Sequence, residues 1–174
     1  PLLLQTGFRA EGSAKLLLLF LSRPECLSYT QREIAVILGI SLGAVNKSLQ
    51  VFDNLKLVIN SGGKRYFGKF KEIVDRWRFV LSDIKQKDLS LGRFSPISDE
   101  FFRIWKVFDL KKFNSYWGGE PAASIRTHYL SPELFNIYTY NENINDLLTM
   151  LRLKRDTNGK VEIFKCFWPD NLNN

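Results

Sequence analysis

The amino-acid sequence predicts an α+β protein, with an N-terminal winged helix-turn-helix domain followed by a small α/β C-terminal domain. Three observations lead to this prediction: two capped helices that meet at a glycine, a hairpin pattern directly after them, and alternating helix-like and strand-like segments in the second half. A chain of 174 residues, 45% of them hydrophobic, can bury one or two cores. We expect the winged domain at residues 1–70, a connector helix and loop at 71–95, and a C-terminal α+β domain at 96–174.

Capping residues mark the first helices. Ser13 is expected to cap an apolar helix that Pro24 brings to an end. Thr30, followed three residues later by Glu33, has the spacing of a capping box. The sequence therefore predicts that a second helix begins at this point.

A tight turn and a third helix follow. Gly39 can adopt the left-handed conformation that such a turn requires, and Ser41 is placed to cap the next helix. Apolar residues then recur every three or four positions, at Val45, Leu49, Phe52 and Leu55. This spacing puts them on one buried face and leaves the opposite face polar.

The polar face of this third helix carries residue types that read base edges or bind phosphate groups. The pattern favours a recognition helix in the major groove of DNA, with phosphate contacts at the start of the second helix. An ordinary helical hairpin with polar outer residues is the alternative. The predicted major-groove contacts are Ser41, Gly43, Asn46, Lys47 and Gln50, and the predicted phosphate contacts are Thr30, Gln31 and Arg32.

Two short β-prone runs surround Gly62 and Gly63, which predicts a hairpin. Lys64 and Arg65 follow its turn, where the wing of a winged helix places cations against the DNA backbone or in the minor groove. A solvated hairpin end is the alternative. We expect that replacing Lys47 or Arg65 weakens DNA binding and flattens its dependence on salt.

Charge is distributed unevenly along the chain. The first 95 residues hold 15 Lys and Arg against 8 Asp and Glu, whereas residues 96–174 hold 10 of each. An N-terminal half with all of the excess positive charge favours contact with a polyanion such as DNA, although a solvated surface of ordinary charge is the alternative.

The rest of the chain is interpreted from the same periodicities. An amphipathic helix is expected from Lys71 to Ile84, and a boundary loop from Ser90 to Pro96. In the second half, Ser98 opens a helix with inward aromatic residues, and two adjacent glycines make a turn into a helix that ends near Leu130. Strands are expected at 135–140 and 161–168, with a helix at 144–153.

Few residues could carry catalysis or bind a metal. His128 is the only histidine, and no Ser or Cys is spaced to form a hydrolytic triad with it. Cys26 and Cys166 lie too far apart for a close-spaced zinc motif or a disulfide framework, which fits a reducing cytoplasm. No apolar run approaches the roughly 20 residues of a membrane span. We therefore expect no enzymatic activity, metal, cofactor or membrane insertion.

One stretch of the second half is more specific than any periodicity. Residues 116–123, Tyr-Trp-Gly-Gly-Glu-Pro-Ala-Ala, together with the winged-domain pattern and motifs at 129–139 and 159–168, resemble the AbiEi-type transcriptional regulators. The resemblance extends roughly from Gly7 to Trp168. It marks a family motif without an assigned role, which consists of Trp117, Gly118, Gly119 and Glu120.

The resemblance implies an antitoxin of a type IV toxin–antitoxin system, a class that acts in abortive infection and phage defence. Such regulators repress their own operon by binding operator repeats in double-stranded DNA, and they counter a nucleotidyltransferase-like toxin without necessarily forming a stable complex. Repressors of this shape often bind as homodimers or cooperatively, because one short helix reads few bases. Some family members have more chain ahead of the winged domain, and since this chain begins at Pro1 we expect such a segment here.

Two rival functions follow from the same residues. A winged fold can serve as a protein-interaction module, with the aromatic second half as the partner surface. Alternatively, Glu120, which lies beside two glycines at a helix start, would handle a nucleotide or a metal in an enzyme. In that case Glu120→Gln would abolish a nucleotide-dependent reaction.

Overall fold

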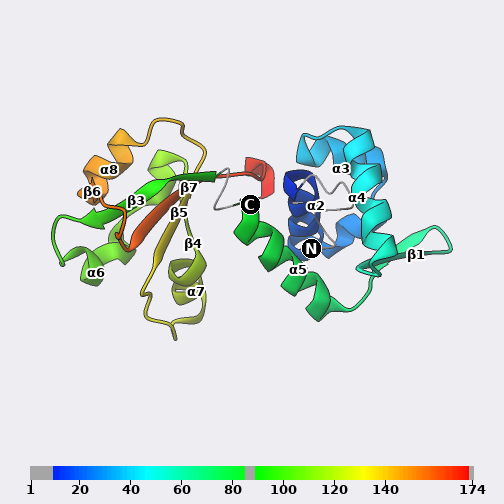
Figure 1. Ribbon diagram of the computed structural model, residues 1–174, viewed down its shortest axis with the longest axis horizontal. Helices are drawn as coiled ribbons and strands as arrows, with labels where there is room; N and C mark the ends of the chain where they lie inside the picture. Colours follow the sequence, from blue (N-terminus) through cyan, green and yellow to red (C-terminus); the bar gives the residue numbers. More distant parts are fainter. Residues whose placement is uncertain (1–9, 85–88, 173–174) are drawn as a thin grey trace. The chain divides into compact units, whose positions relative to one another are not determined.

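A computed structural model describes residues 10–84 and 89–172 of the chain (Figure 1). The chain forms two compact units: unit 1 comprises Pro1–Gln86 and Phe167–Asn174, and unit 2 comprises Lys87–Cys166. Residues 1–9 of the expected winged domain and residues 85–88 of the expected connector lie outside the described residues. Each unit has a hydrophobic core of its own.

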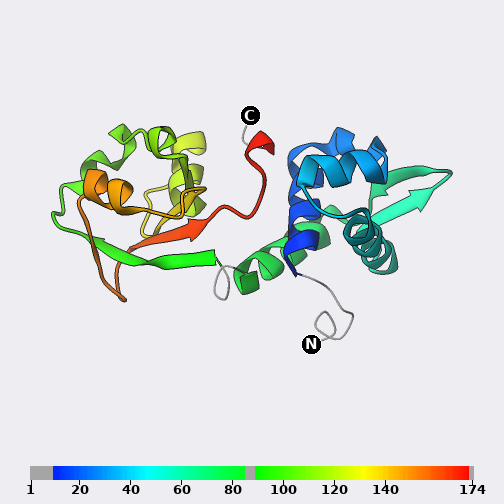
Figure 2. The same ribbon diagram turned by 90° about the horizontal axis from the view of Figure 1, so that it is seen from above.

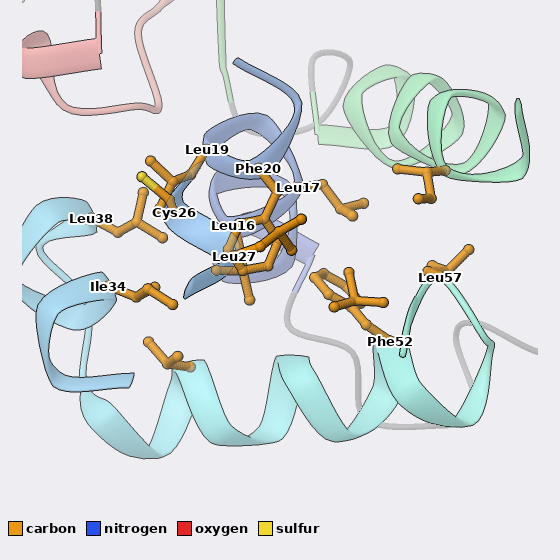
Figure 3. Packing of buried hydrophobic residues seen from close by; sticks show 13 residues of the cluster. Leu16, Leu17, Leu19, Phe20, Cys26, Leu27, Ile34, Leu38, Phe52 and Leu57 are labelled. Atoms are coloured by element: carbon orange, nitrogen blue, oxygen red, sulfur yellow. The ribbon is translucent and has the colours of Figure 1, made fainter. Parts of the chain in front are cut away.

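Unit 1 is mainly helical, with one small hairpin. Its core is formed by apolar side chains of α2, α3 and α4 that point toward one another (Figure 3). Phe20, Ile34 and Phe52 are completely buried there, and burial of each such side chain stabilises the fold by about 1.5–3 kcal/mol. The elements of unit 1 are α2 (Ala10–Ser22), a 3-10 helix (Pro24–Ser28), α3 (Gln31–Leu38), α4 (Leu42–Asn54), β1 (Val58–Ser61), β2 (Lys64–Phe67), α5 (Phe70–Ile84) and a second 3-10 helix (Asp170–Leu172).

The prediction that Ser13 caps the first helix is wrong. Helix α2 already begins at Ala10, and an ion pair of 2.8 Å between Lys15 and Glu11 joins its first two turns. Ser13 lies inside the helix and is buried against α4, where its hydroxyl oxygen is 3.0 Å from that of Ser48. The serine therefore satisfies its hydroxyl across a helix contact and has no capping role.

The turn between α3 and α4 follows the local sequence signals. The capping box is formed, because the Glu33 amide donates to the Thr30 hydroxyl oxygen at 3.2 Å and the Thr30 amide donates to the Glu33 carboxylate at 2.7 Å. Gly39 has φ +61° and ends α3, and Ser41 caps α4 by accepting from the Ala44 amide. These predictions are confirmed. The two helices are bent by 112° relative to each other.

The predicted hairpin and the following helix are also present. Strands β1 and β2 are antiparallel, with Ser61 opposite Lys64 at the turn. Gly62 and Gly63 both have positive φ, at 59° and 78°, as a two-residue type I′ turn requires. Helix α5 then buries Ile73 in the core of unit 1.

Residues 167–172 belong to unit 1, whereas the sequence predicts them to lie in the C-terminal domain. The Arg23 guanidinium donates to the carbonyl oxygen of Asn171 at 2.6 Å, and Leu172 packs against the core of this unit. The Asn171 side-chain amide donates to the Ile37 carbonyl oxygen, near the end of α3. The two hydrogen bonds join residues 148 and 134 positions apart, so local patterns cannot predict them.

Unit 2 contains a five-stranded sheet in the order β4-β5-β7-β3-β6, in which β5 and β7 are parallel and the other neighbours antiparallel. Helices α6 and α8 lie over one face of this sheet (Figure 2) and bury Phe101 and Leu147 against Ile137 and Ile163. The elements are β3 (Ser90–Pro96), α6 (Phe101–Ile104), 3-10 helices at Trp105–Val107 and Leu110–Phe113, β4 (Ser115–Gly118), α7 (Gly119–Thr127), β5 (Phe135–Thr139), α8 (Asn145–Leu151), β6 (Leu153–Arg155) and β7 (Val161–Lys165).

The prediction of a boundary loop at Ser90–Pro96 is wrong, because this segment is strand β3 and pairs with both β6 and β7. Phe94 is buried opposite Val161 and supplies the apolar contact that holds the strand in the sheet. Gly92, with φ +137°, lies where the register shifts, as in a β-bulge. Pro96 is the last residue of the strand, where a missing amide donor costs little.

Three further elements differ from the predictions. The segment expected to be only a turn contains strand β4, in which Trp117 pairs with Ile137 of β5. Helix α7 ends at Thr127, because His128 takes a left-handed conformation with φ +57°. Likewise α8 ends at Leu151, because Arg152 has φ +51°. Leu153, the last residue of the predicted helix, is therefore the first residue of strand β6. Non-glycine residues in this conformation are uncommon, which explains why periodicity alone extended both helices.

Candidate nucleic-acid interface

Helix α4 has one buried and one exposed face. Val45, Ser48 and Phe52 are buried beneath it. The five predicted major-groove contacts are exposed, and Ser41 also caps the helix through its hydroxyl oxygen. They are Ser41, Gly43, Asn46, Lys47 and Gln50. These five residues thus present two carboxamides and one ammonium group.

The predicted phosphate contacts lie at the start of α3. The Thr30 hydroxyl donates to the Glu33 carboxylate at 2.8 Å and accepts from the Glu33 amide, so its hydrogen bonds are used within the capping box. The hydrogen bond from the Thr30 amide, followed by that from its hydroxyl, holds the pKa of the Glu33 carboxyl below its ordinary value. Arg32 is exposed and Gln31 is half-buried.

A hollow of about 170 Å³ brings residues of α3, α4 and the hairpin together. Four of the predicted contacts line it, whereas the other six do not. Asn60 of β1 also lines the hollow and is not among the contacts predicted from the sequence. The lining residues are Gln31, Asn46, Leu49, Gln50, Asp53, Val58, Asn60 and Arg65.

The two cations of the hairpin have different surroundings. Lys64 is exposed beside the Gly-Gly turn. Arg65 is half-buried, and its guanidinium donates to the carbonyl oxygens of Leu27, at 2.9 Å, and of Tyr29. Burial lowers the pKa of Arg65 from its ordinary value. Arg65 therefore fastens the hairpin to the residues that precede α3.

The family motif in unit 2 has a packing role. Trp117 contributes to an aromatic cluster with ring centroids 5.2 Å from Trp105 and 6.2 Å from Phe135, both in edge-on geometry. A side chain at Gly118 would collide with the Tyr138 ring, and one at Gly119, which has φ +53°, would meet the Asn136 side chain. Neither glycine can be replaced without a shift of its surroundings.

Glu120 completes this motif at the first turn of α7. Its carboxylate accepts hydrogen bonds from the backbone amides of Glu133, at 2.7 Å, and Leu134, at 3.1 Å. The bonds connect the start of α7 to the end of the loop that leads into β5. His128 is exposed in this loop. In the part of the chain that the structure describes, no three His, Cys, Asp or Glu side chains are grouped as metal ligands.

No single helix within residues 10–84 and 89–172 has the length and apolar composition to cross a membrane. Helices α3 and α4 meet the criteria of length and apolar composition only when they are counted together, and they are bent by 112° relative to each other.

Comparison with known proteins identifies the family. A family model described as "Transcriptional regulator, AbiEi antitoxin, Type IV TA system" matches residues 67–174, more than half of the chain. The match contains unit 2 and the Trp-Gly-Gly-Glu motif, but α3, α4 and most of the hairpin precede it. The resemblance noted from the sequence begins at Gly7, which lies outside the described residues. No curated protein and no solved structure matches the chain. The chain therefore belongs to the AbiEi antitoxin family of transcriptional regulators in type IV toxin–antitoxin systems.

Proposed function

We propose that this antitoxin binds DNA in a sequence-specific manner and represses its own operon, with α3, α4 and the β1–β2 hairpin as a winged helix-turn-helix. The observation that carries the proposal is the geometry of α3 and α4, which are bent by 112° at a three-residue turn that contains Gly39. Helix pairs at about 90–120° with such a turn are typical of DNA-binding helix-turn-helix motifs. The second helix of such a pair enters the major groove.

The exposed groups suit this mode of docking. Helix α4 would present Asn46 and Gln50 to base edges, and Lys47 to a base or a phosphate. Lys64, at the exposed end of the hairpin, would contact the DNA backbone, as would Arg32 at the start of α3. The excess of positive charge in the first 95 residues would attract the duplex.

The wider assignment rests on family membership. The antitoxin role implies a separate toxin, which we propose is nucleotidyltransferase-like and is countered without a stable complex. A helix as short as α4 contacts few base pairs, so we propose binding as a homodimer or as cooperative pairs at operator repeats.

The test is equilibrium binding of the full chain to a fluorescent duplex from directly upstream of its own gene, compared with a scrambled duplex at two salt concentrations. The proposal predicts much tighter binding to the upstream duplex at both concentrations. Equal binding to both duplexes that disappears at the higher salt would reduce the basic half to a nonspecific polyanion surface and contradict the proposal.

An interaction module is the second candidate, favoured by an exposed apolar cluster in unit 2. The side chain of Tyr129 is 93% exposed, and Ile125, Leu130 and Leu134 are also exposed on the same short stretch of α7 and the loop after it. Exposed apolar groups of this kind are typical of protein–protein contact sites. This function predicts that Tyr129→Ser abolishes binding to a purified protein partner and leaves DNA binding intact. Unchanged partner binding would contradict it.

A further inference from the structure

Carboxamide side chains from three elements line the hollow of unit 1. Asn46 and Gln50 are exposed on α4, Gln31 is the first residue of α3, and Asn60 lies on β1. In the described part of the chain, the side chains of Asn46 and Gln50 form no hydrogen bonds, so their donors and acceptors are available to a ligand.

The spacing along α4 defines a row that faces outward. Leu42, Asn46, Gln50 and Asn54 are separated by four residues each, so they lie one above another on the same side of the helix. Leu42 is 44% exposed, which places an apolar group at the N-terminal end of the row. The row therefore consists of one apolar side chain followed by three carboxamides, of which those of Asn46 and Gln50 line the hollow.

The chemistry of this row matches one kind of base pair. In the major groove, adenine presents an acceptor at N7 and a donor at N6, which a carboxamide satisfies with its amino group and its oxygen. Guanine presents two acceptors, N7 and O6, which are best bound by the two donors of an Arg or Lys. Thymine adds a methyl group that an apolar side chain can contact.

The cation that lines the hollow is already engaged. Arg65 is the cation among the residues that line the hollow, and its guanidinium donates to Leu27 and Tyr29. Asp53 also lines the hollow, and its carboxylate can accept a hydrogen bond from a base donor such as adenine N6 or cytosine N4. Among the described residues that line the hollow, no free cation is left for the two acceptors of guanine, which disfavours guanine as the base read there.

We infer that α4 selects A·T base pairs, with the carboxamides of Asn46 and Gln50 bound to adenine N7 and N6 and with Leu42 against a thymine methyl group. This inference rests on the proposed DNA binding and deepens it, because it names the base pairs that an operator half-site must contain.

The experiment uses duplexes that the full chain selects from a random library. In the selected sequence, each adenine is replaced in turn by 7-deazaadenine, which lacks the N7 acceptor and still pairs with thymine, and each guanine by 7-deazaguanine. Loss of one hydrogen bond should weaken binding roughly 2- to 12-fold. We expect this loss for 7-deazaadenine at one or more positions and for 7-deazaguanine at none of the positions that face α4.

Variants connect the effect to named side chains. Asn46→Ala and Gln50→Ala should each weaken binding to the selected duplex roughly 5- to 150-fold and should abolish the effect of 7-deazaadenine at one position. Asn145→Ala is the matched control, because Asn145 is an exposed carboxamide of helix α8 in unit 2 and does not line the hollow. It should bind like the wild type.

Two results would overturn the inference in distinguishable ways. If the chain selects a sequence but tolerates 7-deazaadenine everywhere, the adenine assignment is wrong and the proposed DNA-binding function survives. If the chain selects no sequence from the library, both the inference and the sequence-specific repressor function are wrong.

Discussion

The Arg65 side chain donates a hydrogen bond from Nε to the carbonyl oxygen of Leu27, 2.9 Å away, and so ties strand β2 to the segment that precedes α3. A second guanidinium nitrogen donates to the Tyr29 carbonyl oxygen. A cation held in this way positions the hairpin, whereas its neighbour Lys64 is exposed and free of such contacts in the described part of the chain. The structure thus favours a positioning role for Arg65 and an exposed contact role for Lys64, although the sequence predicts DNA contact for both.

Substitution of these neighbours separates the two roles. Arg65→Gln should lower the free energy of unfolding by about 1–3 kcal/mol, because it removes charged hydrogen bonds to two backbone carbonyls. It should also weaken DNA binding with little change in salt dependence. Lys64→Gln should leave stability unchanged and reduce the slope of log K against log salt by about 0.9. Urea unfolding and binding titrations measure both. A reduced slope with unchanged stability in Arg65→Gln would assign Arg65 to phosphate contact.

The capping box predicts a pH dependence of stability. Hydrogen bonds from Thr30 keep the pKa of Glu33 below its ordinary value, so the folded chain favours the ionised carboxylate. The stabilisation is complete above the unfolded-state pKa of about 4.3 and is lost as the pH falls through the folded-state pKa. Unfolding of the wild type should therefore show a steeper loss of stability below about pH 4.3 than Glu33→Gln. Identical acid profiles would contradict this role of Glu33.

The glycines of the family motif should not tolerate a side chain. A Cβ atom at Gly118 would collide with the Tyr138 ring, so Gly118→Ala should destabilise the chain by about 1–3 kcal/mol. At Gly12, inside α2, a Cβ atom meets nothing within 4 Å. Gly12→Ala should consequently be neutral or stabilise by up to about 1 kcal/mol. Urea unfolding of both variants is the measurement, and equal midpoints would exclude the packing role of Gly118.

Glu120 should act on the loop between α7 and β5. Glu120→Ala removes the acceptor of the Glu133 and Leu134 amides, so hydrogen exchange at these two amides should become faster. Glu142→Ala, which alters an exposed glutamate of unit 2, is the control and should leave them unchanged. Wild-type exchange rates at the two amides in Glu120→Ala would contradict the structural role of Glu120. Loss of a nucleotide-dependent reaction in the same variant would support the enzymatic alternative.

Local signals predicted the elements of unit 1 well. The Thr30–Glu33 spacing, Gly39 and the Gly62–Gly63 pair each act within a few residues, and each forms the predicted cap or turn. Ser13 is the exception, because its hydroxyl is satisfied by Ser48, which lies on another helix.

Unit 2 was less predictable because its strands depend on distant partners. Strand β3 contains a glycine and a proline, which are uncommon in strands. It is held in the sheet by pairing with β7, in which Phe94 lies opposite Val161, more than 60 residues away in the sequence. Strand β4 is four residues long and is recognisable only from its pairing with β5. Short strands with such partners have no periodicity of their own.

For the candidate interface, the sequence identified which side chains are exposed on α4 but not how the hairpin is attached. The acceptors of Arg65 are the backbone carbonyls of Leu27 and Tyr29, and a backbone acceptor leaves no trace in the amino-acid sequence. Asn60 was missed for a related reason, since its place in the hollow follows from its strand register opposite Arg65.

The most direct test of the central claim, that the exposed face of α4 contacts DNA, is the salt dependence of binding for Lys47→Gln beside Lys112→Gln. Lys47 is exposed on α4, and Lys112 is an exposed lysine of unit 2. On the duplex from directly upstream of the gene, Lys47→Gln should weaken binding and lower the slope of log K against log salt by about 0.9, while Lys112→Gln should match the wild type. Wild-type affinity and slope in Lys47→Gln would contradict the claim that α4 docks on DNA.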